Sequence, residues 1–529
     1  MLQKNSRINT RIYYALILLV VTVAGTLQLL LFHLGVYYTL FDESAHSLTA
    51  YQLDWDNAFR PGVWPPFYKW FVGLLLKIYD DVFYVPRVLV FIFGLLIIIL
   101  LAQLSQELFN DRRISLLTAI LSVLIPHRLI FSVAPMSEIF YYLFMIAAAV
   151  FVISWLRRCN HLHIVLACLF LFLASTVRYE ACFASATLGL FIFYLFVFRK
   201  EVPISIFMIC GLILAAFPGY WMFVHFYWHG SLENVFVTRM QYMSIFGNSY
   251  ARALKSNALT RFGVDLISNP VLLLGIGAMV KLFITDRPIR WWIGVFFGPL
   301  LILTTVMVAT LSIPGASPWR MAGIWTLLTI PFTAFSLVWV TDWQKAHVIR
   351  RRRVLLILTI VAVIPFGIRS AAIAWKAAAA GATRQERQVG LYFRDQLAQQ
   401  KIETNVLIDS TNNLGFLNVI TNSSSPNRFI LNAGEDPVQV GVYVPMRDHY
   451  YREGNTEIIE KYFTDKFDLA HGGSTEKFDA NHIGYVVVKN SDYVRGLDKS
   501  PLVMRASTFG NWVIYIVTAN TVPEYEPGS

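Results

Sequence analysis

The sequence predicts a polytopic α-helical membrane protein that carries a soluble α/β domain at its C-terminal end. Of the 529 residues, 56% are hydrophobic and only 15% are charged, whereas soluble globular domains carry roughly 25% charged residues. Long apolar stretches fill the chain up to residue 372, and the composition of a soluble protein follows. Only 30 Gly, 21 Pro and 4 Cys are present, which excludes collagen-like, disordered and disulfide-stapled classes.

Eleven apolar stretches are long enough to approach the thickness of a bilayer core, about 30 Å. They begin near residues 13, 88, 114, 138, 162, 181, 203, 271, 291, 321 and 354. The first stretch follows basic residues, runs without Lys, Arg, Asp or Glu from Ile12 to Phe41, and lacks a cleavage site of small residues. We therefore interpret it as an uncleaved anchor rather than a signal peptide.

The loop charges predict one orientation. If the N-terminus is cytoplasmic, every loop on its side is basic; these loops hold Lys4, Arg7, Arg11, Arg112, Arg113, Arg157, Arg158, Arg199, Lys200, Arg287, Arg290, Lys345 and Arg350 to Arg353. The short opposite loops at residues 132–137 and 312–319 contain no Lys or Arg. By the positive-inside rule the N-terminus is cytoplasmic, so eleven spans place the C-terminus outside. The formal charge of +11 thus reflects topology, and we expect no nucleic-acid partner.

The C-terminal segment, residues 373–529, reads as a soluble α/β domain of about 150 residues. Residues 384–400 have the pattern of an amphipathic helix, and four short β-rich runs follow it. These runs are residues 405–408, 428–431, 485–488 and 512–517. We therefore expect two domains: a transmembrane domain of residues 1–372, which includes an amphipathic first outside loop at 34–84, and the α/β domain of residues 373–529.

The first outside loop begins with two carboxylates, Asp42 and Glu43, directly after the first span. Adjacent carboxylates repel each other, and the low dielectric at the membrane boundary raises the proton affinity of one of them, which suits a general base. Alternatively, the two acids cap a short interfacial helix that begins near Ser44, because acids favour helix N-termini. Four aromatic residues follow in the same loop: Trp55, Trp64, Tyr68 and Trp70.

Other charged residues fall at the outer ends of later spans. Glu138 lies at the mouth of the fourth span, where it is either functional or, with Ser137, the start of that helix. Arg178 and Glu180 share a short outside loop, as an internal ion pair or as substrate contacts. Arg128 lies near the outer third of the third span, where a guanidinium needs a carboxylate, a phosphate or a route to the interface.

Further cations are expected on the same face. Arg320 opens the tenth span, and the long outside loop at residues 226–270 contains Arg239, Arg252, Lys255 and Arg261. That loop can instead be an amphipathic segment that faces water or lipid headgroups. Carboxylates and cations gathered at the outer lipid boundary suit transfer from a phosphate-bearing lipid. One group activates an acceptor while others stabilise the departing phosphate.

Several short motifs follow one another along the chain in an order that is typical of a known family. They are Asp42-Glu43 after the first span, Pro65-Pro66 before an aromatic helix, Pro86-Arg87 at the start of the second span, Pro-Met-Ser-Glu at 135–138, Arg178-Tyr179-Glu180, and Arg320 opening a late span. With these motifs the membrane half, about residues 10–370, resembles the GT-C superfamily of lipid-linked-sugar glycosyltransferases. The nearest branch is that of the protein mannosyltransferases and aminoarabinose transferases. That branch often has a Lys directly before the Pro-Pro pair, whereas Trp64 stands there in this chain and the nearest Lys is Lys69.

The resemblance implies an inverting glycosyltransferase in the inner membrane of a bacterium. Such an enzyme moves a hexosyl or pentosyl group from a polyprenyl-phosphate donor to a lipid, glycan or protein acceptor on the extracytoplasmic face. Asp42 would be the base, accompanied by Glu43 and Glu138. The donor phosphate would be bound by Arg178, Arg320, Arg128 and Arg239, and further substrate contacts would come from Trp64, Tyr68, Lys69, Arg87, Tyr179 and Glu180.

The same resemblance implies that no cofactor is required, because Arg and Lys replace a metal ion at the phosphate. Some GT-C branches use a divalent metal, for which Glu43 and Glu138 could supply ligands.

Two other classes compete with this interpretation. A secondary transporter of a small or lipid-like anionic substrate would place its binding acids near the bilayer midplane and show paired halves. Here the acids gather at one face and no second half repeats the first. A membrane sensor whose outer domain binds a ligand would leave the clustered acids unexplained.

The predicted orientation can be tested by cysteine labelling in a background without the four native cysteines. A cysteine near Ser312 should react with a membrane-impermeant thiol reagent from outside, and a cysteine near Gln344 should react only after permeabilisation. The reverse pattern would contradict the gathering of these residues on the outer face.

Overall fold

The computed structural model forms two compact units. It describes residues 9–34, 36, 42–55, 58–59, 64–230, 270–299, 301–302, 305, 318–343, 348–379, 382–399, 404–411, 414–443, 451 and 454–518. The membrane unit consists of Met1–Tyr37, Asp54–Tyr68 and Arg87–Ala377. The sheet unit consists of Tyr38–Leu53, Lys69–Pro86 and Ala378–Ser529.

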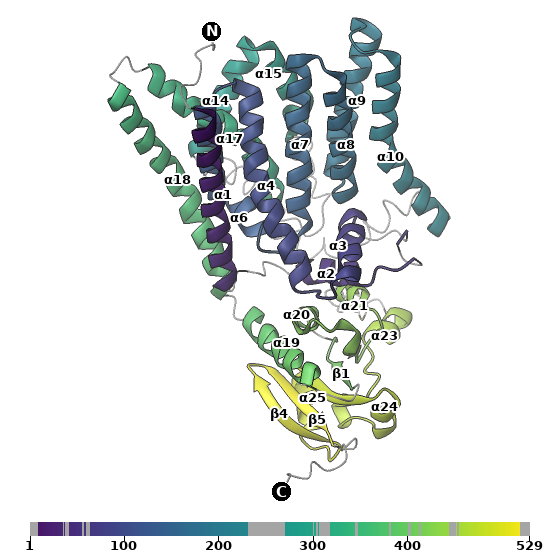
Figure 1. Ribbon diagram of the computed structural model, residues 1–529. Coiled ribbons are helices and arrows are strands. Elements are labelled where there is room, and N and C mark those ends of the chain that lie inside the picture. Colours follow the sequence, from purple (N-terminus) through teal and green to yellow (C-terminus); the bar gives the residue numbers. More distant parts are fainter. Residues whose placement is uncertain are drawn as a thin grey trace. The chain divides into compact units, whose positions relative to one another are not determined.

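The membrane unit is a bundle of helices that lie alongside one another (Figure 1). Its first helices are α1 (Thr10–His33), α4 (Tyr84–Phe109, whose first three residues belong to the sheet unit), α5 (Arg112–Val123), α6 (Pro126–Phe131), α7 (Ser137–Arg158), α8 (His161–Val177) and α9 (Glu180–Tyr194), the last continued by the π-helix Leu195–Arg199. They are followed by α10 (Ile204–His229), α14 (Pro270–Thr285), α15 (Arg287–Trp292), the π-helix Ile293–Phe297, α17 (Pro318–Trp343) and α18 (Val348–Ala379).

A helix begins close to each of the eleven expected starts, but those at the third and ninth predicted spans, α5 and α15, have only 12 and 6 residues. Within the described residues, seven helices are long and apolar enough to cross a membrane: Thr10–His33, Tyr84–Phe109, Ser137–Arg158, Glu180–Arg199, Ile204–Trp228, Ala322–Asp342 and Arg353–Ile373. His161–Val177 and Leu272–Thr285 are shorter apolar helices. The chain is an integral, multi-pass membrane protein, as its composition predicts.

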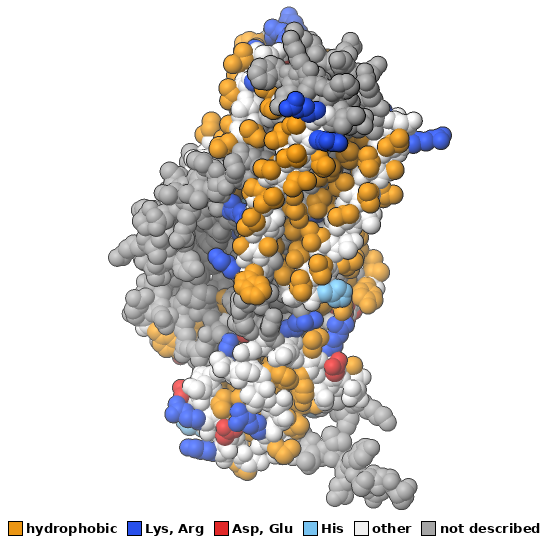
Figure 2. Space-filling view, turned by 90° about the vertical axis from the view of Figure 1, so that its left-hand side faces the viewer, with side chains coloured by type: hydrophobic (Ala, Val, Ile, Leu, Met, Phe, Trp, Pro, Cys, Tyr) orange, Lys and Arg blue, Asp and Glu red, His pale blue; other side chains and the backbone are white. Residues whose placement is uncertain are grey.

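Apolar side chains cover the outside of this bundle. Leu18 on α1, Leu212 on α10 and Ile364 on α18 are each at least half exposed, and Figure 2 shows a broad field of hydrophobic side chains on one face. Soluble monomers rarely expose a contiguous apolar patch of more than a few hundred Å². The covering is therefore a surface for lipid.

Helix α7 lies inside the bundle, where it packs against α8, α15 and α17. Nearly all of its side chains are buried. A polar residue on this helix therefore meets protein rather than lipid, which allows its first turn to carry the charged Glu138.

The sheet unit combines a five-stranded sheet with short helices. Its elements are α2 (Asp42–Tyr51), α3 (Phe67–Ile78, whose first two residues belong to the membrane unit), α19 (Ala382–Gln399), β1 (Asn405–Ile408), α20 (Gly415–Ser423), the 3₁₀ helix Pro426–Arg428, β2 (Phe429–Leu431), α21 (Pro437–Tyr443), α23 (Thr456–Tyr462), the 3₁₀ helix Leu469–His471, α24 (Thr475–Ala480), β3 (Ile483–Val488), α25 (Ser491–Leu497), β4 (Val503–Phe509) and β5 (Trp512–Val517).

The strand order is β2-β1-β3-β5-β4. The pairs β1–β2 and β1–β3 are parallel, whereas β3–β5 and β5–β4 are antiparallel. One face carries the buried residues Leu407, Val486 and Tyr515, which pack with Leu469 and Phe478. Because successive strand residues point to opposite faces, the other face receives α19.

Most of the predicted elements of this unit are confirmed. The amphipathic helix is α19, and the four β-rich runs are β1, β2, β3 and β5. The sequence did not predict β4. The helix expected near Ser44 begins two residues earlier, at Asp42.

The domain boundary also differs from the expected one. Residues 34–84 were expected in the transmembrane domain, but residues 38–53 and 69–86 join the C-terminal residues in the sheet unit. That unit begins again at Ala378, five residues after the predicted boundary.

Candidate active site

Four charged residues of the membrane unit meet at the ends of four helices. Glu138 lies in the first turn of α7, Arg178 and Glu180 lie where α8 passes into α9, and Arg320 lies in the first turn of α17. In α7 the basic Arg157 and Arg158 occupy the opposite end of the helix. The predicted gathering of these four residues is therefore present within the membrane unit.

One carboxylate oxygen joins the two arginines. Arg178 Nη1 donates to Glu138 Oε1 at 2.8 Å, and Arg320 Nε donates to the same oxygen at 2.6 Å. Arg178 also donates two hydrogen bonds to Glu180, from Nη2 to Oε1 at 2.7 Å and from Nε to Oε2 at 3.3 Å. The internal ion pair considered for Arg178 and Glu180 is confirmed. Glu138 Oε2 is buried and has no hydrogen-bond partner in the described part of the chain.

The cluster is compact and electrically balanced, with two guanidinium groups and two carboxylates. A buried charge of this kind persists only with close partners. The space between the groups is about 10 Å³, near the smallest volume that holds one water molecule. A phosphate could therefore reach these arginines only by replacing Glu138 as their partner.

Tight packing of α17 against α7 brings Arg320 to this position. The hydroxyl of Tyr142 on α7 donates to the carbonyl oxygen of Arg320 at 3.1 Å. A Cβ on Gly323 would lie 2.6 Å from Tyr142 Cζ, so only a glycine fits there without movement of the ring. The ring of Tyr141 lies 5.9 Å from Arg178 Cζ.

Arg128 has a different environment from the one expected. It is fully buried, and it donates to three carbonyl oxygens: Ser122 at 3.0 Å, Gly94 at 3.1 Å and Val123 at 2.6 Å. Two of these carbonyls belong to the last turn of α5, where helical carbonyls lack partners within the helix. We infer a structural role for Arg128 in place of the predicted phosphate contact.

The aromatic candidates divide into one anchored residue and two half-buried ones. Tyr68 is buried; its hydroxyl donates to the Pro135 carbonyl at 3.1 Å, and its ring centroid lies 5.4 Å from that of Phe140. It fastens the start of α3 to the segment before α7. Trp64 and Tyr179 are half-buried.

The remaining candidates are basic. Arg87 is buried on α4, and Lys69 is half-buried in the sheet unit. Arg239 lies outside the described residues, as do Arg252, Lys255 and Arg261.

Asp42 and Glu43 belong to the sheet unit rather than the membrane unit. Both lie in the first turn of α2, where negative charge is favourable. Asp42 is half-buried and Glu43 is fully buried. The predicted carboxylates and cations thus divide between two units, and their action on one substrate stays a prediction.

Sequence reasoning missed the residues that surround α2 in the sheet unit. Asn418 accepts a hydrogen bond from Ser44, and Asp81 binds Arg394. No local pattern around these residues signals such contacts, since the partners are hundreds of positions apart.

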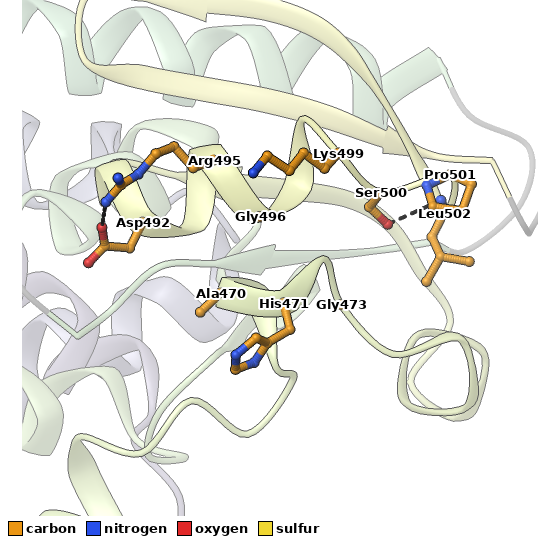
Figure 3. A pocket seen from close by; sticks show the side chains of 10 residues that line it. All are labelled: Ala470, His471, Gly473, Asp492, Arg495, Gly496, Lys499, Ser500, Pro501 and Leu502. Carbon is orange, nitrogen blue, oxygen red and sulfur yellow. Dashed lines mark hydrogen bonds and ion pairs between the residues drawn. The ribbon is translucent and has the colours of Figure 1, made fainter.

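A larger cavity of about 620 Å³ lies elsewhere in the sheet unit. Figure 3 shows its lining, in which Arg495 and Asp492 point toward each other as an ion pair. His471 lies 2.6 Å from Asp468, whose hydrogen bond and charge raise the pKa of the imidazole. These ion pairs are well exposed. The lining includes none of the predicted site residues.

In the part of the chain that the structure describes, no group of three His, Cys, Asp or Glu residues is arranged to hold a metal ion. Glu43 and Glu138, the predicted metal-ligand candidates, belong to different units. The use of a divalent metal therefore stays a prediction.

No protein-family model and no curated protein matches this chain. Solved structures do. ArnT from Cupriavidus metallidurans in the apo state is similar with a TM-score of 0.58 at 11% identity, over 94% of this chain and 97% of that one. The structure of the same protein bound to undecaprenyl phosphate is similar with a TM-score of 0.58 at 11% identity, over 95% of this chain and 97% of that one.

The oligosaccharyltransferase of Archaeoglobus fulgidus in the apo form is similar with a TM-score of 0.51 at 14% identity, over 91% of this chain and 70% of that one. The chain therefore shares its fold with these two proteins, in agreement with the expected polytopic helical domain followed by an α/β domain.

Proposed function

We propose that this chain is an integral-membrane glycosyltransferase that moves a sugar from a polyprenyl-phosphate donor to an acceptor. One observation carries the proposal: Arg178 and Arg320 converge on a single anionic oxygen at one end of the bundle. The fold around them is that of ArnT, whose structure has been determined with undecaprenyl phosphate. Two guanidinium groups directed at one oxygen form an arrangement suited to a phosphate.

The donor phosphate would take the place of Glu138 between the two arginines. The positive charge of Arg178 and Arg320 stabilises the phosphate as it leaves with the bonding electrons, so it needs neither a proton nor a metal ion. Glu138 then acts as a positioning residue that holds both guanidinium groups in place before the donor binds. Its second oxygen can accept a hydrogen bond from a substrate hydroxyl.

Asp42 is the proposed base. It takes the proton from the acceptor oxygen or nitrogen, which attacks the anomeric carbon on the side opposite the phosphate. The new bond joins the acceptor to that carbon, the bond to the phosphate oxygen breaks, and the configuration inverts. Glu43 is the second carboxylate of this site.

The other proposed substrate contacts are Trp64, Lys69, Arg87, Tyr179 and Glu180, with Arg239 at the phosphate. Of the predicted set we leave out Tyr68, whose hydroxyl and ring are engaged with Pro135 and Phe140. A lipid, glycan or protein can serve as acceptor.

The proposed location is the inner membrane of a bacterium, with the reaction on the extracytoplasmic face. The separation of charge along α7 supports this orientation, because Glu138 begins the helix and Arg157 and Arg158 end it. By the positive-inside rule the basic end is cytoplasmic.

Replacing Arg178 or Arg320 with Ala should weaken binding of undecaprenyl phosphate by roughly 1.5–3 kcal/mol, the value of a charge-assisted hydrogen bond. Affinity is measured with purified protein in nanodiscs. Arg113→Ala is the matched control, since Arg113 also pairs with two carboxylates, Asp111 at 2.7 Å and Asp342 at 3.0 Å, and belongs to a predicted cytoplasmic loop. Unchanged affinity in both test variants would leave Arg178 and Arg320 as structural ion-pair residues.

Asp42→Asn should fold, insert and bind undecaprenyl phosphate, yet transfer sugar at least about 100-fold more slowly, because general-base assistance contributes typically 10²–10⁴-fold. The amide keeps the size of the carboxylate but cannot take the proton. Asp492→Asn, an exposed acid of the same unit, is the control and should transfer normally. A near wild-type rate for Asp42→Asn would rule out Asp42 as the base and favour its role in the helix N-terminus.

A further inference from the structure

Helix α2, which carries Asp42, cannot fix its own position. It has ten residues, and helices shorter than about 12 residues are marginal in water on their own. Even so, seven of its ten residues are buried: Glu43, Ser44, Ala45, His46, Ser47, Leu48 and Ala50. The position of the helix therefore depends on what packs around it.

Helix α20 of the C-terminal segment contacts α2 at Ser44, two residues after Asp42. The hydroxyl of Ser44 donates to Asn418 Oδ1 at 2.6 Å, and both residues are buried. Asn418 is held in turn by Asn422, whose side-chain amide donates to the Asn418 carbonyl at 2.6 Å. A hydrogen bond between buried neutral groups is strengthened by the low local dielectric. It is also costly to break, because the partner left behind stays unsatisfied.

The end of α2 is tied to the same C-terminal segment. Asn427 Nδ2 donates to the Tyr51 hydroxyl at 2.9 Å, and Gln52 Nε2 donates to Asp436 Oδ1 at 3.4 Å. Burial, with the charge of Asp80, raises the pKa of Tyr51 to about 12, so its hydroxyl is protonated at neutral pH. Both ends of α2 thus contact residues of the sheet unit.

Helix α3 and the segment after it form further contacts around α2. A Cβ on Gly73 would lie 2.6 Å from the Ala50 carbonyl oxygen and 2.7 Å from Leu53 Cδ2, so α3 approaches α2 as closely as a glycine permits. Beyond α3, Asp81 accepts from Arg394 at 3.2 Å and from Ser424 at 3.1 Å. Asp81 therefore ties the segment after α3 to α19 and to the end of α20.

We propose that the C-terminal domain positions the catalytic base, and that Asn418 is the positioning residue through its hydrogen bond to Ser44. This inference rests on the proposed role of Asp42. Ser44 lies two residues from Asp42, about 3 Å along the helix axis, so a shift of Ser44 moves the carboxylate. A displacement of about 1 Å can cost a reaction 10²-fold, which gives this remote domain a direct effect on the rate.

The test compares Ser44→Ala and Asn418→Ala in the full chain with Ser47→Ala. Ser47 is the matched control, because it is a buried serine of the same helix whose hydroxyl donates within α2, to the Glu43 carbonyl at 2.9 Å. Transfer from undecaprenyl-phosphate-linked monosaccharides is followed as release of undecaprenyl phosphate in membranes. We expect kcat to fall about 10- to 100-fold in both test variants, with KM for the donor within about twofold. The double variant should be no slower than either single one.

Hydrogen–deuterium exchange gives a second readout that does not require turnover. Ser44→Ala and Asn418→Ala should speed exchange of the amides at residues 42–51, whereas Ser47→Ala should not. Wild-type kcat in both test variants, an equal loss in Ser47→Ala, or faster exchange confined to α20 would overturn the positioning role.

Failure of the proposed function would look different. In that case the wild-type protein would release no undecaprenyl phosphate, and the exchange rates at residues 42–51 alone would decide whether α20 holds α2.

Discussion

The pairing of Glu138 with Arg178 and Arg320 is the interaction on which the membrane unit depends most. Charges at the edge of a hydrocarbon layer persist only with close partners, and these three side chains come from α7, the α8–α9 junction and α17. Each pair therefore joins helices as well as neutralising charge. The phosphate site that we propose depends on the same pairing, because an anion that replaces Glu138 meets two guanidinium groups already in place.

The chemistry we propose is divided between two units. The membrane unit supplies the arginines, and the sheet unit supplies Asp42 on a short helix held by α20. Residues 38–53 and 69–86 join residues hundreds of positions later in the sheet unit. In our proposal this packing holds the base in position.

Much of this arrangement can be predicted from the sequence, because apolar length and loop charge are local properties. These properties place Glu138, Arg178 and Arg320 at helix ends. They do not predict which of these residues pair, because the pairs join residues 40 and 182 positions apart. Strand β4 escaped prediction because its Val-Met-Arg-Ala-Ser-Thr-Phe sequence is mostly exposed at the sheet edge. A guanidinium within a span needs a partner, which predicts a phosphate for Arg128. Its actual partners are backbone carbonyls, and these leave no sequence signal. The Ser44–Asn418 contact spans 374 positions, and its residue types are common in any polar helix.

The most direct test of the central claim is native mass spectrometry of lipids that copurify with the full-length protein. The proposed site predicts a polyprenyl phosphate, free or sugar-linked, on the wild-type protein. It also predicts loss of that lipid from the Arg178→Ala, Arg320→Ala double variant and its retention in Arg113→Ala. Retention of the lipid by the double variant, or a wild-type protein that carries no polyprenyl phosphate after incubation with it, would contradict a donor site built from these two arginines.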